Sequence, residues 1–173
     1  MDATSRMTWR AWFDVPADKA LARLADWEKG RPFVDDAKAY SVEKSTADGA
    51  LLRVKKKAPL IFMPDPDVLF RATVKSEPGG GGTVTWTQVD GPARSMVRTW
   101  KVVPKAGGAW IEHETVLELP FSPPSFLFGD GAELLARQVA VARRELGAKV
   151  SRAKAATKPV MGRPEKPTSP AKP

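Results

Sequence analysis

The sequence predicts an α+β fold in which a curved antiparallel sheet of about seven strands wraps around a long C-terminal helix. The first observation is the alternation of apolar and polar residues through three successive segments between Thr83 and Leu119, a period that strands produce. The second is the turn residues between those segments, Asp90-Gly91-Pro92 and Gly107-Gly108. The third is an apolar stripe at helical spacing, formed by Leu135, Val139, Ala142, Leu146 and Val150.

The two turns predict which residues face each other across the strands. Around Gly107-Gly108, the expected pairs are Val102 with Ile111, Trp100 with His113, Arg98 with Thr115 and Met96 with Leu117. Around Asp90-Gly91-Pro92, they are Gln88 with Arg94, Trp86 with Met96 and Val84 with Arg98. The apolar positions then share one face, and that face also carries the polar side chains of Gln88, Arg98 and His113.

The remaining segments complete the sheet and add two short helices. Pro16 is expected to open a helix after a first strand, and a second short helix runs from Asp26 to the Gly30-Arg31-Pro32 break. The expected strands are Thr8 to Val15, Asp35 to Ser45, Leu51 to Lys57 and Val68 to Glu77. We interpret the run Lys55-Lys56-Lys57 as a solvated strand end. Asp130 and Glu133 form a capping-box-like start for the long helix.

Composition limits the chemistry and the organisation of the chain. Its 173 residues favour one domain, which we place at residues 1–156, followed by a disordered, basic, proline-rich tail at 157–173. Five of the eight net positive charges lie between Arg152 and Pro173. There is no cysteine and one histidine, so thiolate or histidine-pair metal sites are excluded, and we expect neither a metal nor a cofactor. No signal-like or membrane-spanning run is visible, and we expect a cytoplasmic protein.

Two stretches carry a resemblance to a known superfamily: WFDVPADKALARLADWEKGRPF and VDGPARSMVRTWKVVPKAGGAWIEHET. The first is similar to the strand, proline and helix opening of the START-like helix-grip (SRPBCC) superfamily. The second is similar to the Gly-Pro turn, strand tryptophan and hairpin of its polyketide cyclase and coenzyme-Q-binding branch. The resemblance covers most of Thr8 to Val150, and it implies a deep apolar cavity between sheet and helix. The basic tail is not explained by the family pattern.

The inner face of the sheet supplies the candidate ligand-binding residues. We expect these to be Tyr40, Phe70, Trp86, Gln88, Met96, Arg98, Trp100, His113 and Leu117. The alternative is plain core, because core and cavity wall are made by the same strand faces in this fold. Arg98 must find an anion or several acceptors, supplied either by an Asp or Glu from another element or by a ligand. His113 is either a hydrogen-bonding group in the cavity or a core imidazole satisfied by a Thr or a carbonyl.

Two apolar loops are expected at one end of the sheet, because every second connection of a meander emerges at the same end. They are Leu60-Ile61-Phe62-Met63 and Phe126-Leu127-Phe128. They form either the rim of a cavity mouth, at Phe62 and Phe126, that touches a membrane or partner, or a lid folded inward.

Three functions fit these observations. The first is binding or carriage of a hydrophobic small molecule such as a lipid, quinone or polyketide, because no catalytic constellation is visible. The second is an enzyme of the cyclase or aromatase type, in which Arg98, His113 and Tyr40 act on a carbonyl. The third is an interaction module whose basic tail binds an anionic membrane or nucleic acid. The tail contains no aromatic residue, which argues against nucleic acid.

Deletion of residues 157–173 should leave the fold intact, because this segment has too few apolar groups to offset the entropy of ordering it. The measurement is the melting temperature of the truncated chain. A fall of more than a few degrees would show that the tail is docked. If the tail acts electrostatically, its loss should weaken binding to anionic vesicles at low salt and matter little at high salt.

Overall fold

The computed structural model describes residues 3–58, 60–122 and 131–147, and its main element is one antiparallel sheet. The sheet has seven strands in the order β1-β7-β6-β5-β4-β3-β2. The strands are β1 (Ala3–Phe13), β2 (Ala37–Ser45), β3 (Gly49–Lys56), β4 (Asp67–Ser76), β5 (Gly82–Asp90), β6 (Ser95–Lys105) and β7 (Gly108–Leu119). The predicted α+β class and strand number are confirmed.

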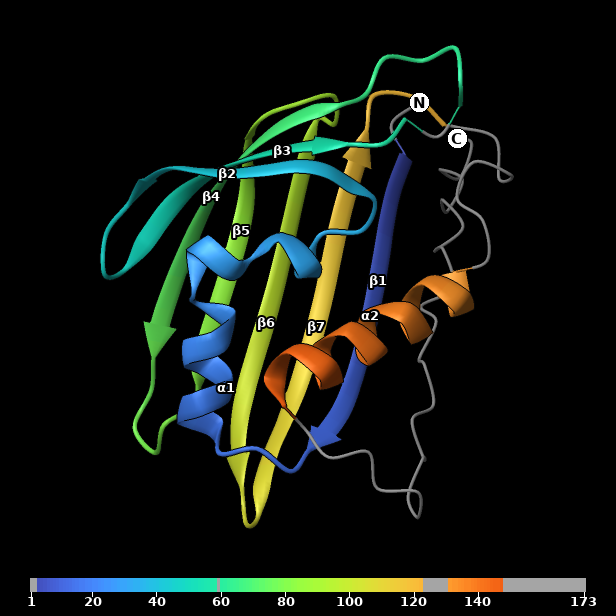
Figure 1. Cartoon of the computed structure of the whole chain (residues 1–173). Helices are drawn as coiled ribbons and strands as arrows, with labels where there is room; N and C mark the ends of the chain where they lie inside the picture. The colour runs from blue at the N-terminus through green and yellow to red at the C-terminus, as the bar shows by residue number, and fades with distance from the viewer. Residues whose placement is uncertain (1–2, 59, 123–130, 148–173) are drawn as a thin grey trace, which may run out of the picture.

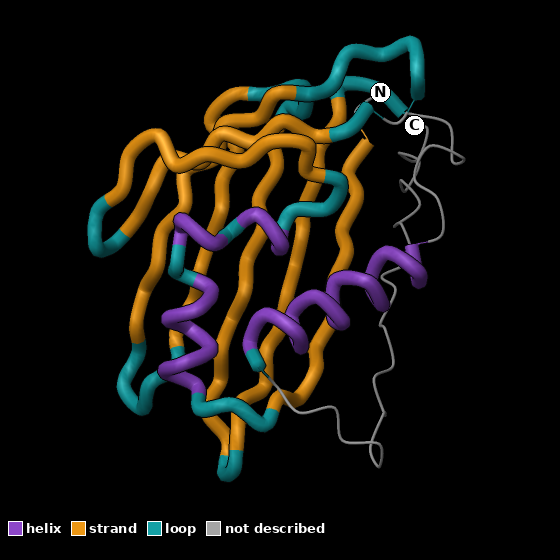
Figure 2. The backbone as a smooth tube through the Cα atoms, in the orientation of Figure 1, coloured by secondary structure: helices purple, strands orange, loops and turns teal. Residues whose placement is uncertain are grey.

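The helices lie on one face of this sheet (Figure 1). They are α1 (Ala17–Leu24), two short 3-10 helices, η1 (Trp27–Lys29) and η2 (Arg31–Phe33), and α2 (Gly131–Leu146). Figure 2 shows that α1 and α2 cover the same side while β2 and β3 curl over one end. The expected helix N-cap Asp130 and the last stripe residue Val150 lie outside the described residues. Within the described part, no helix is long and apolar enough to cross a membrane.

The first strand is longer than its sequence pattern suggests. It begins at Ala3 rather than Thr8, because the polar residues Thr4 to Arg6 pair with Val116 to Glu118 at the sheet edge. An edge strand exposes part of its length, so apolar alternation is not required there.

The register of β6 and β7 is confirmed, and the register predicted for β5 and β6 is wrong by two residues. Trp86 pairs with Arg98 and Val84 pairs with Trp100. The ladder ends at the pair Thr87 and Val97, and the Gln88 side chain donates from Nε2 to the Ala93 carbonyl over 2.7 Å, inside a longer loop. Because the slip is an even number, every side chain stays on its predicted face.

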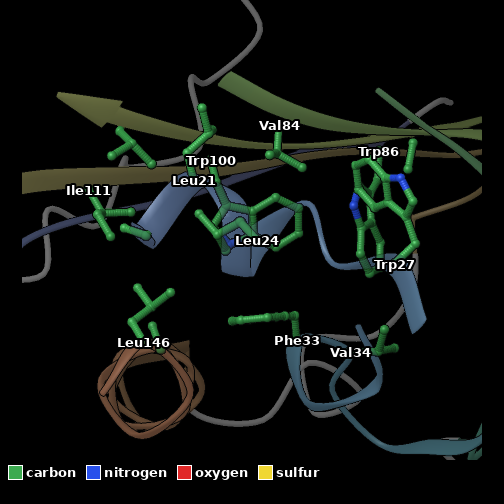
Figure 3. Packing of buried hydrophobic residues seen from close by; sticks show 14 of the residues in the cluster. Leu21, Leu24, Trp27, Phe33, Val34, Val84, Trp86, Trp100, Ile111 and Leu146 are labelled. Atoms are coloured by element: carbon green, nitrogen blue, oxygen red, sulfur yellow. The ribbon is translucent and has the colours of Figure 1, made fainter. Parts of the chain in front are cut away.

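The core fills the space between the sheet and the helices. Leu21 and Leu24 of α1, Phe33 of η2 and Leu146 of α2 converge on the inner face of the sheet, which presents Trp100 and Ile111 (Figure 3). Trp86 stands at the centre of an aromatic group, with ring centroids 5.3 Å from Trp100 and 5.8 Å from Phe70. The packed aromatic rings hold the strands that carry the site in fixed positions.

Polar contacts fasten α2 over this core. Arg23 of α1 and Glu145 of α2 form an ion pair at 2.7 Å, with both side chains about one-fifth exposed. Trp9 of β1 donates from Nε1 to Gln138 Oε1 at 3.2 Å. Gln138 therefore holds α2 to the edge strand of the sheet.

Candidate functional site

A cavity of about 330 Å³ lies between the inner face of the sheet and the first turns of α2. Its walls come from β1, the segment after η2, strands β3, β4, β6 and β7, and α2. The lining residues are Met7, Val34, Asp35, Asp36, Lys56, Phe70, Met96, Arg98, Thr115, Leu117, Glu133, Leu134, Arg137 and Gln138. A second hollow of about 440 Å³ shares Asp36, Lys56, Met96 and Leu117 with it and extends to the base of the β3–β4 loop. We call the first the inner cavity and the second the outer hollow.

Among the six charged residues that line the inner cavity, Arg98 is the buried one. It lies on the inner face of β6 and is 6% exposed. Its guanidinium carbon lies 4.8 Å from the ring centroid of Trp100 and 5.7 Å from that of Trp86, so the aromatic rings give it cation–π contact. Among the described residues, no hydrogen bond or ion pair of its guanidinium is present. Burial lowers the pKa of Arg98, while the charge of Asp35 acts in the opposite direction.

Asp35 is held in place from α2. Gln138 donates from Nε2 to Asp35 Oδ2 at 2.8 Å, while its own Oε1 accepts from the indole of Trp9. The carboxylate attracts Arg98 through space without an ion-pair contact at 4 Å or less. The sequence did not reveal Asp35, because its partners lie far along the chain.

His113 is a satisfied core imidazole, one of the two interpretations that the sequence left open. Its Nδ1 lies 2.9 Å from the Thr99 carbonyl, which can only accept, so Nδ1 carries the proton. In the neutral ring Nε2 then accepts from the Thr115 hydroxyl at 3.1 Å. The ring stacks on Trp100 with centroids 4.5 Å apart. Burial, and then the charge of Arg98, hold the pKa of His113 well below its ordinary value.

The structure distributes the other predicted binding residues between cavity wall and packed core. Phe70, Met96, Arg98 and Leu117 line the inner cavity. The remaining five, Tyr40, Trp86, Gln88, Trp100 and His113, do not line it. The Tyr40 hydroxyl donates to the Trp27 carbonyl, and burial, followed by the charges of Glu28 and Asp26, raises the pKa of Tyr40. Tyr40, Arg98 and His113 therefore do not form one hydrogen-bonded group.

The lysine run does mark the end of β3, but Lys56 is half-buried rather than fully solvated. Leu52 and Val54 are buried on the inner face of β3, and the same alternation carries Lys56 inward at the end of the strand. Lys56 lines both the inner cavity and the outer hollow. The signal was present in the sequence as a period of two, but the flanking lysines Lys55 and Lys57, which are exposed, obscured it.

Asp36 also lines both hollows. Its backbone φ is +55°, and it is the one non-glycine residue in the described part of the chain with a positive φ. Its backbone carbonyl accepts from the Lys57 amide at 2.8 Å, which fixes the turn next to β3. Aspartate tolerates this left-handed conformation better than most residues do. The turn therefore brings an acidic side chain to the wall that carries Lys56.

The apolar loop between β3 and β4 borders the outer hollow through Lys57, Ala58 and Pro66. Ile61 and Phe62 at its tip are 106% and 83% exposed. An inward-folded lid therefore does not describe Phe62. The second apolar loop, with Phe126, lies outside the described residues.

A further depression, of about 340 Å³, lies over β1, β7 and β6, with Arg10, Lys101, Glu112 and Glu114 among its walls. It shares no lining residue with the inner cavity. These four residues point to the outer face of the sheet, and Arg10 and Glu112 neutralise each other as an ion pair at 3.2 Å. Among the described residues, no group of three or more His, Cys, Asp or Glu side chains is placed to hold a metal ion.

The architecture and the cavity define the class: the chain has the START-like helix-grip fold. It is similar to a STAR-related lipid transfer protein from Xanthomonas axonopodis, with 21% identity, a TM-score of 0.65 and coverage of 81% of this chain and 84% of that one. It is also similar to the Zhui aromatase/cyclase from Streptomyces sp. R1128, at 11% identity, a TM-score of 0.60 and coverage of 84% and 93%.

A third similar structure is the human StarD13 lipid transfer and protein localization domain, at 17% identity, a TM-score of 0.60 and coverage of 82% and 76%. At these identities the likeness shows the fold alone. No family model and no curated protein sequence matches the chain.

Unfolding should show that His113 is neutral in the folded chain. Its pKa is lowered by folding, so the unfolded chain binds more protons below about pH 6.5, and stability should fall as the pH drops from there. The slope should approach about 1.4 kcal/mol per pH unit. Urea unfolding between pH 7.5 and 5 measures it above the range in which carboxylates titrate. Because His113 is the one histidine, His113→Gln should flatten this dependence; parallel curves would contradict the assignment.

Proposed function

We propose that this protein binds and carries a hydrophobic small molecule of the lipid, quinone or polyketide kind, with Arg98 holding its polar or anionic end. The observation that carries the proposal is the buried guanidinium of Arg98 in the wall of a cavity that also presents the apolar side chains of Met7, Val34, Phe70, Met96, Leu117 and Leu134. Phe70, Met96 and Leu117 are proposed to contact the apolar part of the ligand.

The cost of burying Arg98 supports a ligand partner. A buried cation without a hydrogen-bond acceptor loses several kcal/mol of hydration that cation–π contact offsets only in part. A carboxylate could accept from the guanidinium in bidentate fashion, and a quinone or polyketide carbonyl could accept one bond. The fold shared with a lipid transfer protein and with an aromatase/cyclase supports the same class of ligand by analogy.

A cyclase or aromatase is the second candidate. The fold shared with an aromatase/cyclase and the proximity of His113 to Arg98 favour it. Both ring nitrogens of His113 are already bonded, and the Tyr40 hydroxyl is bonded to a backbone carbonyl. Proton transfer by these groups would require those bonds to break first, so binding without catalysis is the better supported proposal.

Transient contact with a membrane is part of the proposal. The exposed Ile61 and Phe62 lie on the loop that borders the outer hollow, where a ligand would exchange. We also propose that the protein acts in the cytoplasm, as its lack of cysteine suggests. The role of the basic tail on anionic membranes stays a prediction, as does the second mouth position Phe126, since both lie outside the described residues.

Native mass spectrometry of the purified protein tests the proposed function directly. A lipid-sized molecule should remain bound in the gas phase and be released on denaturation. A chain that carries nothing and that takes up neither decanoate nor a decyl-substituted quinone would contradict the proposal.

Arg98→Met should reduce affinity for the ligand while sparing the fold, because it keeps the bulk and removes the buried charge. The expected loss is about 1.5–3 kcal/mol, the scale of a charged hydrogen bond. Titration followed by the emission of Trp86 and Trp100 measures it, with decanoate and the decyl quinone as ligands. Arg71→Met, on the exposed side of β4, is the matched control and should change nothing. Equal affinity in Arg98→Met, or its unfolding, would refute the anchor role.

Phe62→Ser should weaken association with lipid vesicles while changing the free energy of unfolding by less than about 0.5 kcal/mol, because the side chain is 83% exposed. Phe62→Leu keeps an apolar tip and should bind vesicles nearly as the wild type does. Sedimentation with vesicles and urea unfolding give the two quantities. A loss of stability of about 1.5–3 kcal/mol would instead show that Phe62 packs inward as a lid.

A further inference from the structure

Lys56 lines a cavity without a bonded partner for its ammonium group among the described residues. It lies on the inner side of β3 at the junction of the inner cavity and the outer hollow, beside Met96 and Leu117. Within the described ranges, no carboxylate or carbonyl lies within hydrogen-bond or ion-pair distance of its ammonium group. By contrast, Lys38, a lysine on β2, forms an ion pair with Asp65 at 2.6 Å.

The charges around Lys56 disfavour its protonated form. Burial lowers the pKa of Lys56, and the positive charge of Arg98 lowers it further. Asp35 and Asp36 act in the opposite direction but do not cancel the effect. From α2, Glu133 and Arg137 line the same cavity with opposite charges. At neutral pH a larger fraction of Lys56 is therefore the free amine than of a solvent-exposed lysine.

We propose that Lys56 is a reactive amine that condenses with a ketone or aldehyde carbonyl of a molecule held in the inner cavity. The nitrogen lone pair adds to the carbonyl carbon, and the carbonyl oxygen takes up a proton to give a carbinolamine. Loss of water then leaves a C=N bond between Lys56 and the ligand. One water is released for each bond formed, and no oxidant or reductant is needed. This inference rests on the proposed function, because it uses the same cavity and narrows its ligand to carbonyl compounds.

The charges that line the cavity are mixed. Asp35, Asp36 and Glu133 share its walls with Arg98 and Arg137, so an anionic end has the buried Arg98 as its partner. A neutral carbonyl can therefore lie at Lys56.

Nonane-2,4-dione is a suitable probe, because a 1,3-diketone that condenses with an amine rearranges to a stable enaminone with its own near-ultraviolet absorbance. Ordinary lysines are protonated at neutral pH and react slowly, so a lysine with a larger free-amine fraction is labelled faster. The full chain should gain one probe mass less one water. Peptide mapping should place that mass on Lys56. The labelling rate should rise with pH and level off below the pH at which an exposed lysine does.

Variants separate Lys56 from its neighbours. Lys56→Met should lower the labelling rate at least tenfold, whereas Lys55→Met, at the adjacent exposed position, should leave it unchanged. Lys56→Met removes a partly buried charge and should fold, which its melting temperature checks. Adducts spread over exposed lysines at similar rates, or an unchanged rate in Lys56→Met, would overturn the proposal. Mapping of the wild-type adduct gives the same answer if the variant does not fold.

Decan-1-ol, which has no carbonyl, separates this proposal from the proposed function. If decan-1-ol changes the tryptophan emission but the diketone does not label Lys56, the cavity binds apolar molecules and the reactive amine is wrong. If Lys56→Met binds decanoate more weakly and no adduct forms in the wild type, Lys56 is an anion anchor, and this also overturns the proposal. If neither decan-1-ol nor the diketone binds, both proposals fail together.

Discussion

The site depends on one buried charge, the guanidinium of Arg98 on the inner face of the sheet. Around it, the faces of Trp86 and Trp100 supply the nearest favourable contact. The same positive charge helps keep His113 neutral, and that neutral ring is held by Thr99 and Thr115. Asp35 gives partial compensation from a distance, and Gln138 of α2 fixes its position. The polar residues of the inner face thus form one electrostatic arrangement.

The inner face serves as packed core at one end and as cavity wall at the other. Near the Gly107 hairpin, Phe13, Val102 and Ile111 are fully buried beneath the helices. Toward the opposite end, Met96 and Leu117 are only half-buried and line both hollows. The change from large, closely packed side chains to flexible Met and Leu along the same strands leaves the space that a ligand can use.

The sequence predicted those parts of the molecule that depend on local periodicity. The β6–β7 register was correct because the Gly107-Gly108 turn fixes it. The stripe on α2 was correct for Leu135, Val139, Ala142 and Leu146, because its helical period is regular. The predicted β5–β6 register was wrong because the local pattern did not show the length of the loop. The Gln88 side chain bonds to the Ala93 carbonyl within that loop, and the ladder ends before it. Asp35 depends on Gln138, a residue 103 positions away, and no local pattern could indicate that contact.

The sequence could not show that Arg98 lines the cavity while Tyr40 does not, because both residues alternate inward on their strands. What distinguishes them is whether a backbone acceptor lies within reach, which only the folded chain shows. Tyr40 reaches the Trp27 carbonyl, and His113 reaches that of Thr99.

The placement of Arg98 and Lys56 in one cavity has a cost in stability that the fold itself does not require. Arg98 and Lys56 repel each other, and hydrophobic residues of similar volume at both positions would pack at least as well. Their carboxylate neighbours reduce this repulsion without forming ion pairs with them in the described part of the chain. Proteins accept such local instability at functional sites, where a charged or reactive group is needed for binding or chemistry. Among the residues that the structure describes, Arg98 and Lys56 have side-chain hydrogen-bond donors without bonded acceptors, and apolar side chains lie beside them. This arrangement favours a ligand whose polar end accepts hydrogen bonds and whose remainder is apolar.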